Sequence, residues 1–202
     1  MILLTSLPSD DLIIVPAGTT MRWEIAITES AIARTIRVIV QEGAIMHQRI
    51  QLVAVTGSLR LEYILGRGSR MSLQASALLR QQQQLQITTM QQHEEPYAAS
   101  TTKVYTVVQD QATLQYEAAI YIAPSAVQTE AVQHNKNLLL SPRAVVHAKP
   151  TLAVLHDHVT CSHGSATEYL DPLQRYALMS RGLPSEQAEQ LLIDSFLREM
   201  VV

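Results

Sequence analysis

The sequence contains a single cysteine, Cys161, among its 202 residues, and this scarcity excludes several kinds of site. No intrachain disulfide can form, and no metal site can be built from cysteines of this chain alone. Aromatic residues are also few, at 4%, with one Trp and one Phe. Modules that bind single-stranded nucleic acids stack bases on aromatic side chains, so this composition argues against them.

Charge and hydrophobic runs argue against two further classes. The formal net charge is −3 and the basic residues form no long run, so we expect no nucleic-acid partner. The start, MILLTSLPSDDLIIV, lacks the cationic segment of a secretion signal. No later stretch approaches the ~20 apolar residues that a membrane-spanning helix needs. A single cysteine also fits a reducing compartment, so we expect a cytoplasmic protein without membrane contact.

Short strand-like runs fill most of the first 160 residues. Apolar residues make up 47% of the chain, enough to form a core. The runs are rich in Val, Ile, Leu, Thr and Tyr, and small or polar residues separate them. They are Leu12–Val15, Ile36–Val40, Gln51–Val55, Leu59–Leu65, Leu85–Thr88, Lys103–Val108, Thr113–Tyr116, Ala119–Ile122, Leu138–Leu140 and Leu152–Leu155.

Two β architectures fit these runs, a sandwich or barrel and a stacked β-solenoid. Centres near Tyr105, Ile120, Leu139 and Ala153 recur roughly every fifteen residues, which is irregular support for the solenoid. Periodicity alone leaves the choice open. The glutamine-rich stretch Arg80–Gln92 fits either a helix or a polar strand with its turn.

After Asp171 the pattern becomes helical. Asp171 is a good N-cap, Pro172 suits the first helical position, and Gly182 can end the helix in the left-handed conformation. A second helix is expected to start at Pro184 and Ser185. Its apolar stripe consists of Ala188, Leu191, Leu192, Phe196 and Met200. The two helices should form a small hairpin.

Five blocks in the last third of the chain resemble the SufD family, in that family's order and with similar gaps. They are Asn137-Leu-Leu-Leu-Ser141, Ala148-Lys-Pro150, Val159-Thr-Cys-Ser-His-Gly164, Leu170-Asp171 and Ser180-Arg-Gly182. Two upstream segments, Val15-Pro-Ala-Gly18 and Gln109–Gln133, resemble it more loosely. SufB proteins usually carry a glutamate-containing version of the Cys-Ser-His-Gly segment, so this chain is more similar to SufD.

This resemblance implies both a fold and a role. The fold is mainly β: a right-handed parallel β-helix over residues 1–170, followed by a C-terminal helical hairpin over residues 171–202. The role is that of a scaffold without its own enzymatic activity in iron–sulfur cluster assembly. Such a subunit pairs with a SufB-like protein through the β-helix ends and docks a SufC-like ABC ATPase through its terminal helices. A homodimer is a further possibility.

The chain also departs from the family pattern. The family usually has Ala-Thr after Cys-Ser-His-Gly and then a glycine, where this chain reads Ser165-Ala-Thr-Glu168-Tyr. Paired aspartates before the cysteine are replaced by Asp157-His158. Long members also have a helical amino-terminal extension and continue beyond the equivalent of Val202. These departures favour an alternative: a divergent β-helix protein with a structural or metal- or ligand-binding role that has lost the assembly function.

Cys161 and His163 are the candidate metal ligands. If their segment is extended, both side chains leave the same face, with Cα atoms roughly 6.5–7 Å apart. A thiolate and an imidazole suit iron, zinc or a nascent cluster. The resemblance associates this pair with cluster formation at the SufB–SufD interface. Two ligands do not complete a site, so we expect no stably bound cofactor, only transient iron or a nascent Fe–S cluster shared with the partner. The alternative is a structural cysteine beside a histidine that caps the β-helix end.

Further candidates are less specific. His156 and His158 share a strand face if extended and could add ligands, although solvated side chains explain them more simply. An enzyme using Cys161 as a nucleophile would need a base within about 3 Å, and no phosphate loop, Ser-hydrolase elbow or HExxH motif is present. The resemblance assigns ATPase docking to the helical hairpin, and packing on the β body explains the second helix equally well. The partner-binding candidates are Arg181, Gly182, Leu191, Leu192 and Phe196.

Overall fold

A computed structural model describes residues 2–4, 11–28 and 30–201. Within them the chain forms strands first and helices last. The strands are β1 (Ile2–Leu4), β2 (Leu12–Val15), β3 (Thr20–Ile27), β4 (Ala31–Val40), β5 (Ile45–Val53), β6 (Thr56–Leu65), β7 (Arg70–Leu79), β8 (Gln84–His93), β9 (Ala99–Val108), β10 (Thr113–Ile122), β11 (Glu130–Leu139), β12 (Val145–Val154) and β13 (Thr160–Tyr169). The helices are α1 (Pro172–Met179) and α2 (Ser185–Arg198), which continues into the 3₁₀ turn η1 (Glu199–Val201). The predicted bounds at residues 1 and 202 lie outside the described residues.

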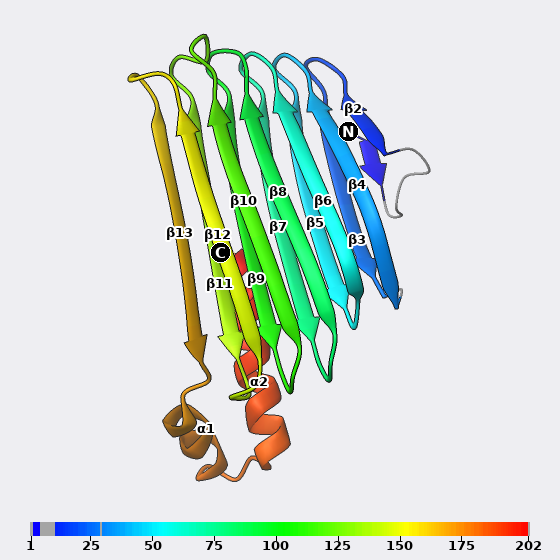
Figure 1. Ribbon diagram of the computed structural model, residues 1–202, viewed down its shortest axis with the longest axis vertical. Helices are drawn as coiled ribbons and strands as arrows, with labels where there is room; N and C mark the ends of the chain where they lie inside the picture. Colours follow the sequence, from blue (N-terminus) through cyan, green and yellow to red (C-terminus); the bar gives the residue numbers. More distant parts are fainter. Residues whose placement is uncertain (1, 5–10, 29, 202) are drawn as a thin grey trace.

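The strands form two parallel sheets. One has seven strands in the order β1-β3-β5-β7-β9-β11-β13, and the other six in the order β12-β10-β8-β6-β4-β2. Successive strands alternate between the sheets, so each pair makes one coil, and Figure 1 shows the two layers face to face. The result is a β-solenoid of about five turns with two C-terminal helices. The predicted mainly β, parallel β-helix with a helical tail is confirmed, and the sandwich alternative is excluded by the parallel pairing.

Several predicted strand runs are parts of longer strands. The runs Thr113–Tyr116 and Ala119–Ile122 belong to one strand, β10, and the glutamine-rich stretch Arg80–Gln92 is a turn followed by β8. Strands β1, β3, β7 and β13 lie outside the predicted runs. Strands β9 to β13 follow each other at the predicted spacing because half a coil, one strand with its turn, is the repeating unit.

The turns that enter the seven-stranded sheet stack on each other along the solenoid. The residue in the left-handed conformation is Gly18, Gly43 and Gly68 in successive coils, and then Tyr97 and Gln128. Each donates its backbone N–H to a carbonyl of the next turn, at 2.8–3.0 Å. Glycine adopts this conformation without steric cost, whereas the two side-chain-bearing residues do not. The turns therefore become more strained toward the C-terminal end.

The helices begin and end as predicted. The Asp171 carboxylate accepts a hydrogen bond from the Leu173 backbone N–H at 2.8 Å, and Gly182 has a φ of +94°. Helix α2 packs on the outer face of the seven-stranded sheet, where the Phe196 and Tyr105 ring centroids are 5.5 Å apart. The cluster at this contact contains Tyr105, Val107, Leu138, Ile193, Phe196 and Met200. None of the described helices is long and apolar enough to cross a membrane.

Candidate functional site

Strands β12 and β13 are the outermost strands at the C-terminal end of the two sheets. Each is paired on one side only, and within the described chain no further coil covers them. The side chains that face inward on β12 are consequently only half-buried, among them Val146, Ala148, Pro150 and Leu152. Leu155 and Tyr169 are 55% and 60% exposed. The interior of the solenoid is therefore open at this end.

Cys161 and His163 lie on the inward face of β13, at this open end. Strand β13 pairs in parallel with β11, so that Cys161 is in register with Ala131 and His163 with Gln133. Both of these β11 residues are fully buried in the interior. In-register residues of adjacent strands share a face, so the expected common orientation of Cys161 and His163 follows. Cys161 packs against an apolar cluster that includes Ala131, whereas His163 is exposed.

The environment of Cys161 sets its protonation. Burial raises the pKa of the Cys161 thiol, which keeps the thiol protonated at neutral pH. A metal ion binding there has to displace this proton. The described residues contain no group of three or more His, Cys, Asp or Glu side chains that could hold a metal ion. Cys161 and His163 alone would not complete a ligand set, and a metal role for them remains a prediction.

A row of buried amides on β11 forms the floor beneath β13. Asn135 Oδ1 accepts a hydrogen bond from the Ser165 hydroxyl at 3.0 Å. Asn137 Nδ2 donates to the Thr167 hydroxyl at 3.1 Å. The two asparagines also bond to each other, at 2.7 Å and 3.1 Å. The third amide of the row is Gln133, in register with His163.

The next layer inward is also polar. Gln133 Nε2 donates to the Tyr116 hydroxyl at 3.2 Å, and that hydroxyl is 3.0 Å from Thr89 Oγ1. Burial raises the pKa of Tyr116 to about 12. Burial also lowers the pKa of His93 to about 4, and its Nε2 lies 2.8 Å from the Ser100 hydroxyl. Both groups are therefore neutral at pH 7.

These interior polar residues were not among the sequence candidates. Alternation marks which positions of a strand share a face, but side-chain polarity places Gln, Asn and His on the solvent side by default. The signal available in the sequence was the phase of the alternation along the strand. Gln133, Asn135 and Asn137 fall on the same alternate positions as the apolar Ala131 and Leu139. That phase indicates an inward orientation.

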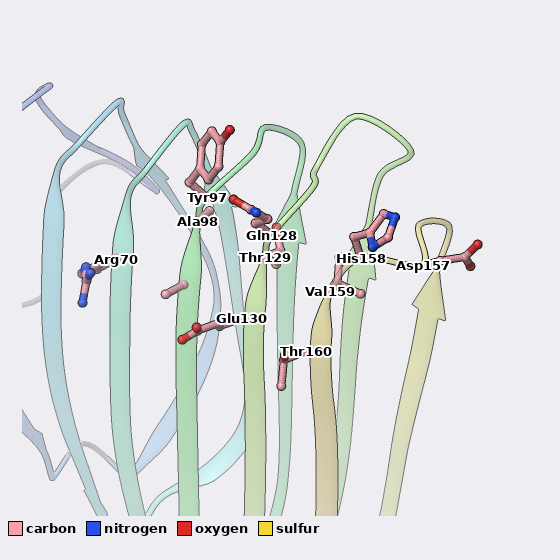
Figure 2. A pocket seen from close by; sticks show the side chains of 11 residues that line it. Arg70, Tyr97, Ala98, Gln128, Thr129, Glu130, Asp157, His158, Val159 and Thr160 are labelled. Carbon is pink, nitrogen blue, oxygen red and sulfur yellow. The ribbon is translucent and has the colours of Figure 1, made fainter.

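A cavity near this end lies on the outside of the turns, and it does not include Cys161 or His163. It measures 520 Å³ and is lined by turn residues such as Tyr97, Gln128 and His158 and by the strand residues Arg70 and Glu130. Figure 2 shows the turn side chains above the row of outward-facing strand residues. The cavity is lined by both basic and acidic side chains, so its charge favours no single class of ligand.

His156 and His158 lie in the turn between β12 and β13, not on a strand, so the expected shared strand face is wrong. β12 already ends at Val154. The His158 backbone N–H donates to His156 Nδ1 at 3.0 Å, and the ring centroids are 5.6 Å apart. This hydrogen bond bends the chain into the turn and occupies one ring nitrogen of His156.

The partner-binding candidates differ in exposure. Arg181 and Gly182 are exposed in the turn between the helices, and Leu191 is 49% exposed. Leu192 is half-buried, and Phe196 is buried against the β body. A partner would have to displace α2 to contact Phe196.

Helix α1 presents apolar side chains that the sequence candidates omitted. Leu173 and Tyr176, three residues apart on one helical face, are 72% and 69% exposed, and α1 buries no residue. An apolar helix face of this kind is typical of a protein-binding surface.

Comparison with known proteins identifies relatives. Residues 20–196 match the family model described as "SUF system FeS cluster assembly, SufBD core domain". The chain is 32% identical over 112 residues to the iron–sulfur cluster assembly protein SufD of Escherichia coli (strain K12), covering 55% of this chain and 26% of that protein. It is 38% identical over 95 residues to SufD of Bacillus subtilis (strain 168), covering 47% and 22%. It is 34% identical over 106 residues to a SufBD family protein of Synechocystis sp., covering 52% and 23%. The chain thus matches about a quarter of the length of these relatives.

Proposed function

The chain belongs to the SufBD core family of the SUF iron–sulfur cluster assembly system, and from this membership we propose that it is a scaffold subunit without catalysis of its own. The observation that carries the proposal is the open last coil, with Cys161 and His163 on its inward face. In this proposal the subunit works in the cytoplasm. It pairs there with a SufB-like protein and a SufC-like ABC ATPase.

The uncovered end of the solenoid supports pairing with a SufB-like subunit. A solenoid end exposes its core and its unpaired strand edges unless something caps it. Here the exposed positions include Val154, Leu155 and Tyr169, at 39%, 55% and 60%. The end of a second β-solenoid has the matching shape and hydrogen-bonding edge. A second copy of this chain could occupy the same surface, and the experiment below separates the two.

Cys161 and His163 would contribute two donors to iron or to a nascent cluster, which is the cargo of the complex. The soft thiolate and the imidazole are suitable ligands for iron. The partner would supply the remaining ligands across the interface, since the described residues hold no third donor near the pair. Loss of the Cys161 proton on binding would couple loading to pH.

The helical hairpin is the proposed ATPase-docking surface. Its exposed apolar residues are Leu173 and Tyr176 on α1 and Leu191 on α2, and the Arg181–Gly182 turn lies between the helices. An amphipathic helix laid into a groove of the partner uses anchors of this type. Phe196 would act from beneath by holding α2 against the β body.

Co-expression with SufB-like and SufC-like proteins, followed by affinity capture and native mass measurement, tests the proposal. We expect a stoichiometric complex whose iron loading is lost in Cys161→Ala and His163→Ala. Ser162→Ala is the matched control, because Ser162 lies between them on the opposite face of β13. A monomer that captures neither protein would contradict the scaffold role and support the divergent binding protein. A homodimer alone would replace the SufB-like partner with a second copy.

A further inference from the structure

The three amides beneath β13 form a series in which two members have partners on that strand. Asn135 bonds to Ser165 and Asn137 bonds to Thr167. Gln133 occupies the equivalent position beneath His163. No such bond joins Gln133 to His163 in the structure, although the register and the shared face are the same.

Only one of the two polar atoms of the Gln133 amide has a hydrogen-bond partner among the described residues. Its Nε2 is engaged by the Tyr116 hydroxyl at 3.2 Å, which fixes the orientation of the amide. Its Oε1 is buried and has no hydrogen-bond partner among the described residues, and Gln133 is fully buried. A buried carbonyl oxygen without a donor is costly, so such an atom usually has a partner. Neighbouring strands are ~4.8 Å apart, which places the His163 ring within reach.

We propose that Gln133 is a positioning residue, whose Oε1 accepts a hydrogen bond from one ring N–H of His163. This bond would leave the other ring nitrogen unprotonated and directed toward the open end of the solenoid. Histidines that bind metals commonly donate their second ring nitrogen to such an acceptor, which fixes tautomer and orientation. A neutral amide suits this task because it holds the ring without favouring the imidazolium that cannot bind metal.

The metal-directed part of this inference rests on the proposed function, but the hydrogen bond itself does not. It can be tested in the metal-free protein by ¹⁵N NMR of the histidine rings, with His163→Ala used to assign the signals. We expect one dominant tautomer of His163 in the wild type. In Gln133→Met, which keeps the volume and removes the strong acceptor, we expect a mixture of tautomers.

A matched control lies on strand β9, one coil further from the open end than Gln133. Thr102 is in register with Gln133, fully buried, and its hydroxyl also lacks a partner among the described residues. Thr102→Val should leave the His163 tautomer unchanged, because Thr102 is not adjacent to β13. Tyr116→Phe keeps the Gln133 oxygen but removes the hydroxyl that orients the amide, so it should also give a mixture of His163 tautomers. This variant also provides a second test if Gln133→Met does not fold.

Two outcomes overturn the proposal: equal tautomer populations in wild type and Gln133→Met, or a mixture in the wild type already. Failure of the proposed function gives a different signature. In that case the tautomer shifts as expected, but iron loading of the SufB-like complex does not change in His163→Ala. If both ideas hold, Gln133→Met lowers iron affinity of the complex by about 10-fold or more, the usual effect of losing such an acceptor.

Discussion

The two halves of the solenoid interior are built from different residues. In the N-terminal half most of the large inward side chains are apolar, and Trp23, Leu61 and Leu73 are fully buried, with Gln48 as a buried amide among them. In the C-terminal half many of the inward positions in register with these residues carry amides or hydroxyls, such as Gln133 and Asn137. Apolar burial provides most of the stability of a fold, whereas a hydrogen-bonded network fixes the positions of its members. The comparison indicates that the N-terminal half supplies more of the apolar burial and the C-terminal half more of the hydrogen-bonded network.

The largest expected effect is in the apolar half. Trp23→Ala removes a fully buried side chain and should lower the free energy of unfolding by about 3–5 kcal/mol. Cys161→Ala, at the open end, should lower it by less than about 1 kcal/mol, because Cys161 is small and only half-buried. Urea denaturation of both variants measures the difference. Similar losses in the two variants would contradict the division of roles.

In the polar C-terminal half, substitutions should lower the stability mainly through lost hydrogen bonds rather than through lost buried volume. Asn137 bonds to Thr106, Asn135 and Thr167, so Asn137→Ala leaves several buried groups without partners. We expect a loss of about 2–3 kcal/mol, most of it from these unsatisfied groups. Hydrogen exchange should show faster opening of β11 and β13 than of β3 and β5. Uniform loosening of the whole solenoid would indicate that the two halves are not distinct.

The polar half should also be sensitive to pH. Burial holds the pKa of His93 at about 4, below the ordinary 6.5, so the unfolded chain binds a proton in this window and the native protein does not. The stability contribution is complete above pH 6.5 and is lost as the pH falls toward 4, with about 1–2 kcal/mol gone at pH 5. His93→Gln should flatten this part of the stability profile. An unchanged profile in that variant would show that His93 is not responsible.

The smallest effect concerns the stacked turns. Gln128 adopts the left-handed conformation with φ of +53°, where the N-terminal coils have glycines such as Gly68. Gln128→Gly should raise the stability by up to about 1 kcal/mol, and Gly68→Gln should lower it by a similar amount. Thermal unfolding of the pair gives the sign of each change. Loss of stability in Gln128→Gly would mean that the side chain contributes more than its strain costs.

Much of the fold follows from local signals. The cap at Asp171 and the glycine at 182 define the helical hairpin, and runs such as Leu59–Leu65 predict strands because apolar and charged residues alternate there. β7 contains no β-branched or aromatic residue and therefore has weak strand propensity, so its pairing with β5 and β9 is what makes it a strand. Strand spacing alone did not distinguish the solenoid from a sandwich or barrel. The resemblance of the last third of the chain to the SufD family is what favoured the solenoid.

The candidate site was predicted only in part. The spacing of Cys161 and His163 predicts a shared face, and the structure places them on one. The amides beneath them could not be predicted, because a buried polar network is stable only through partners distant in sequence, such as Tyr116 and Gln133. The packing of Phe196 on Tyr105 depends on tertiary contact in the same way. The local sequence pattern therefore predicts the secondary-structure elements and the faces of the strands, whereas the register between β11 and β13 determines which side chains meet at the candidate site.

The most direct test of the account is hydrogen–deuterium exchange with and without the SufB-like protein. If the open polar end is the functional end, the backbone of β12 and β13 becomes protected on mixing, and the backbone of β2 and β4 keeps its exchange rate. Protection confined to β2 and β4, or none anywhere, would contradict the claim that the last coil is the assembly surface.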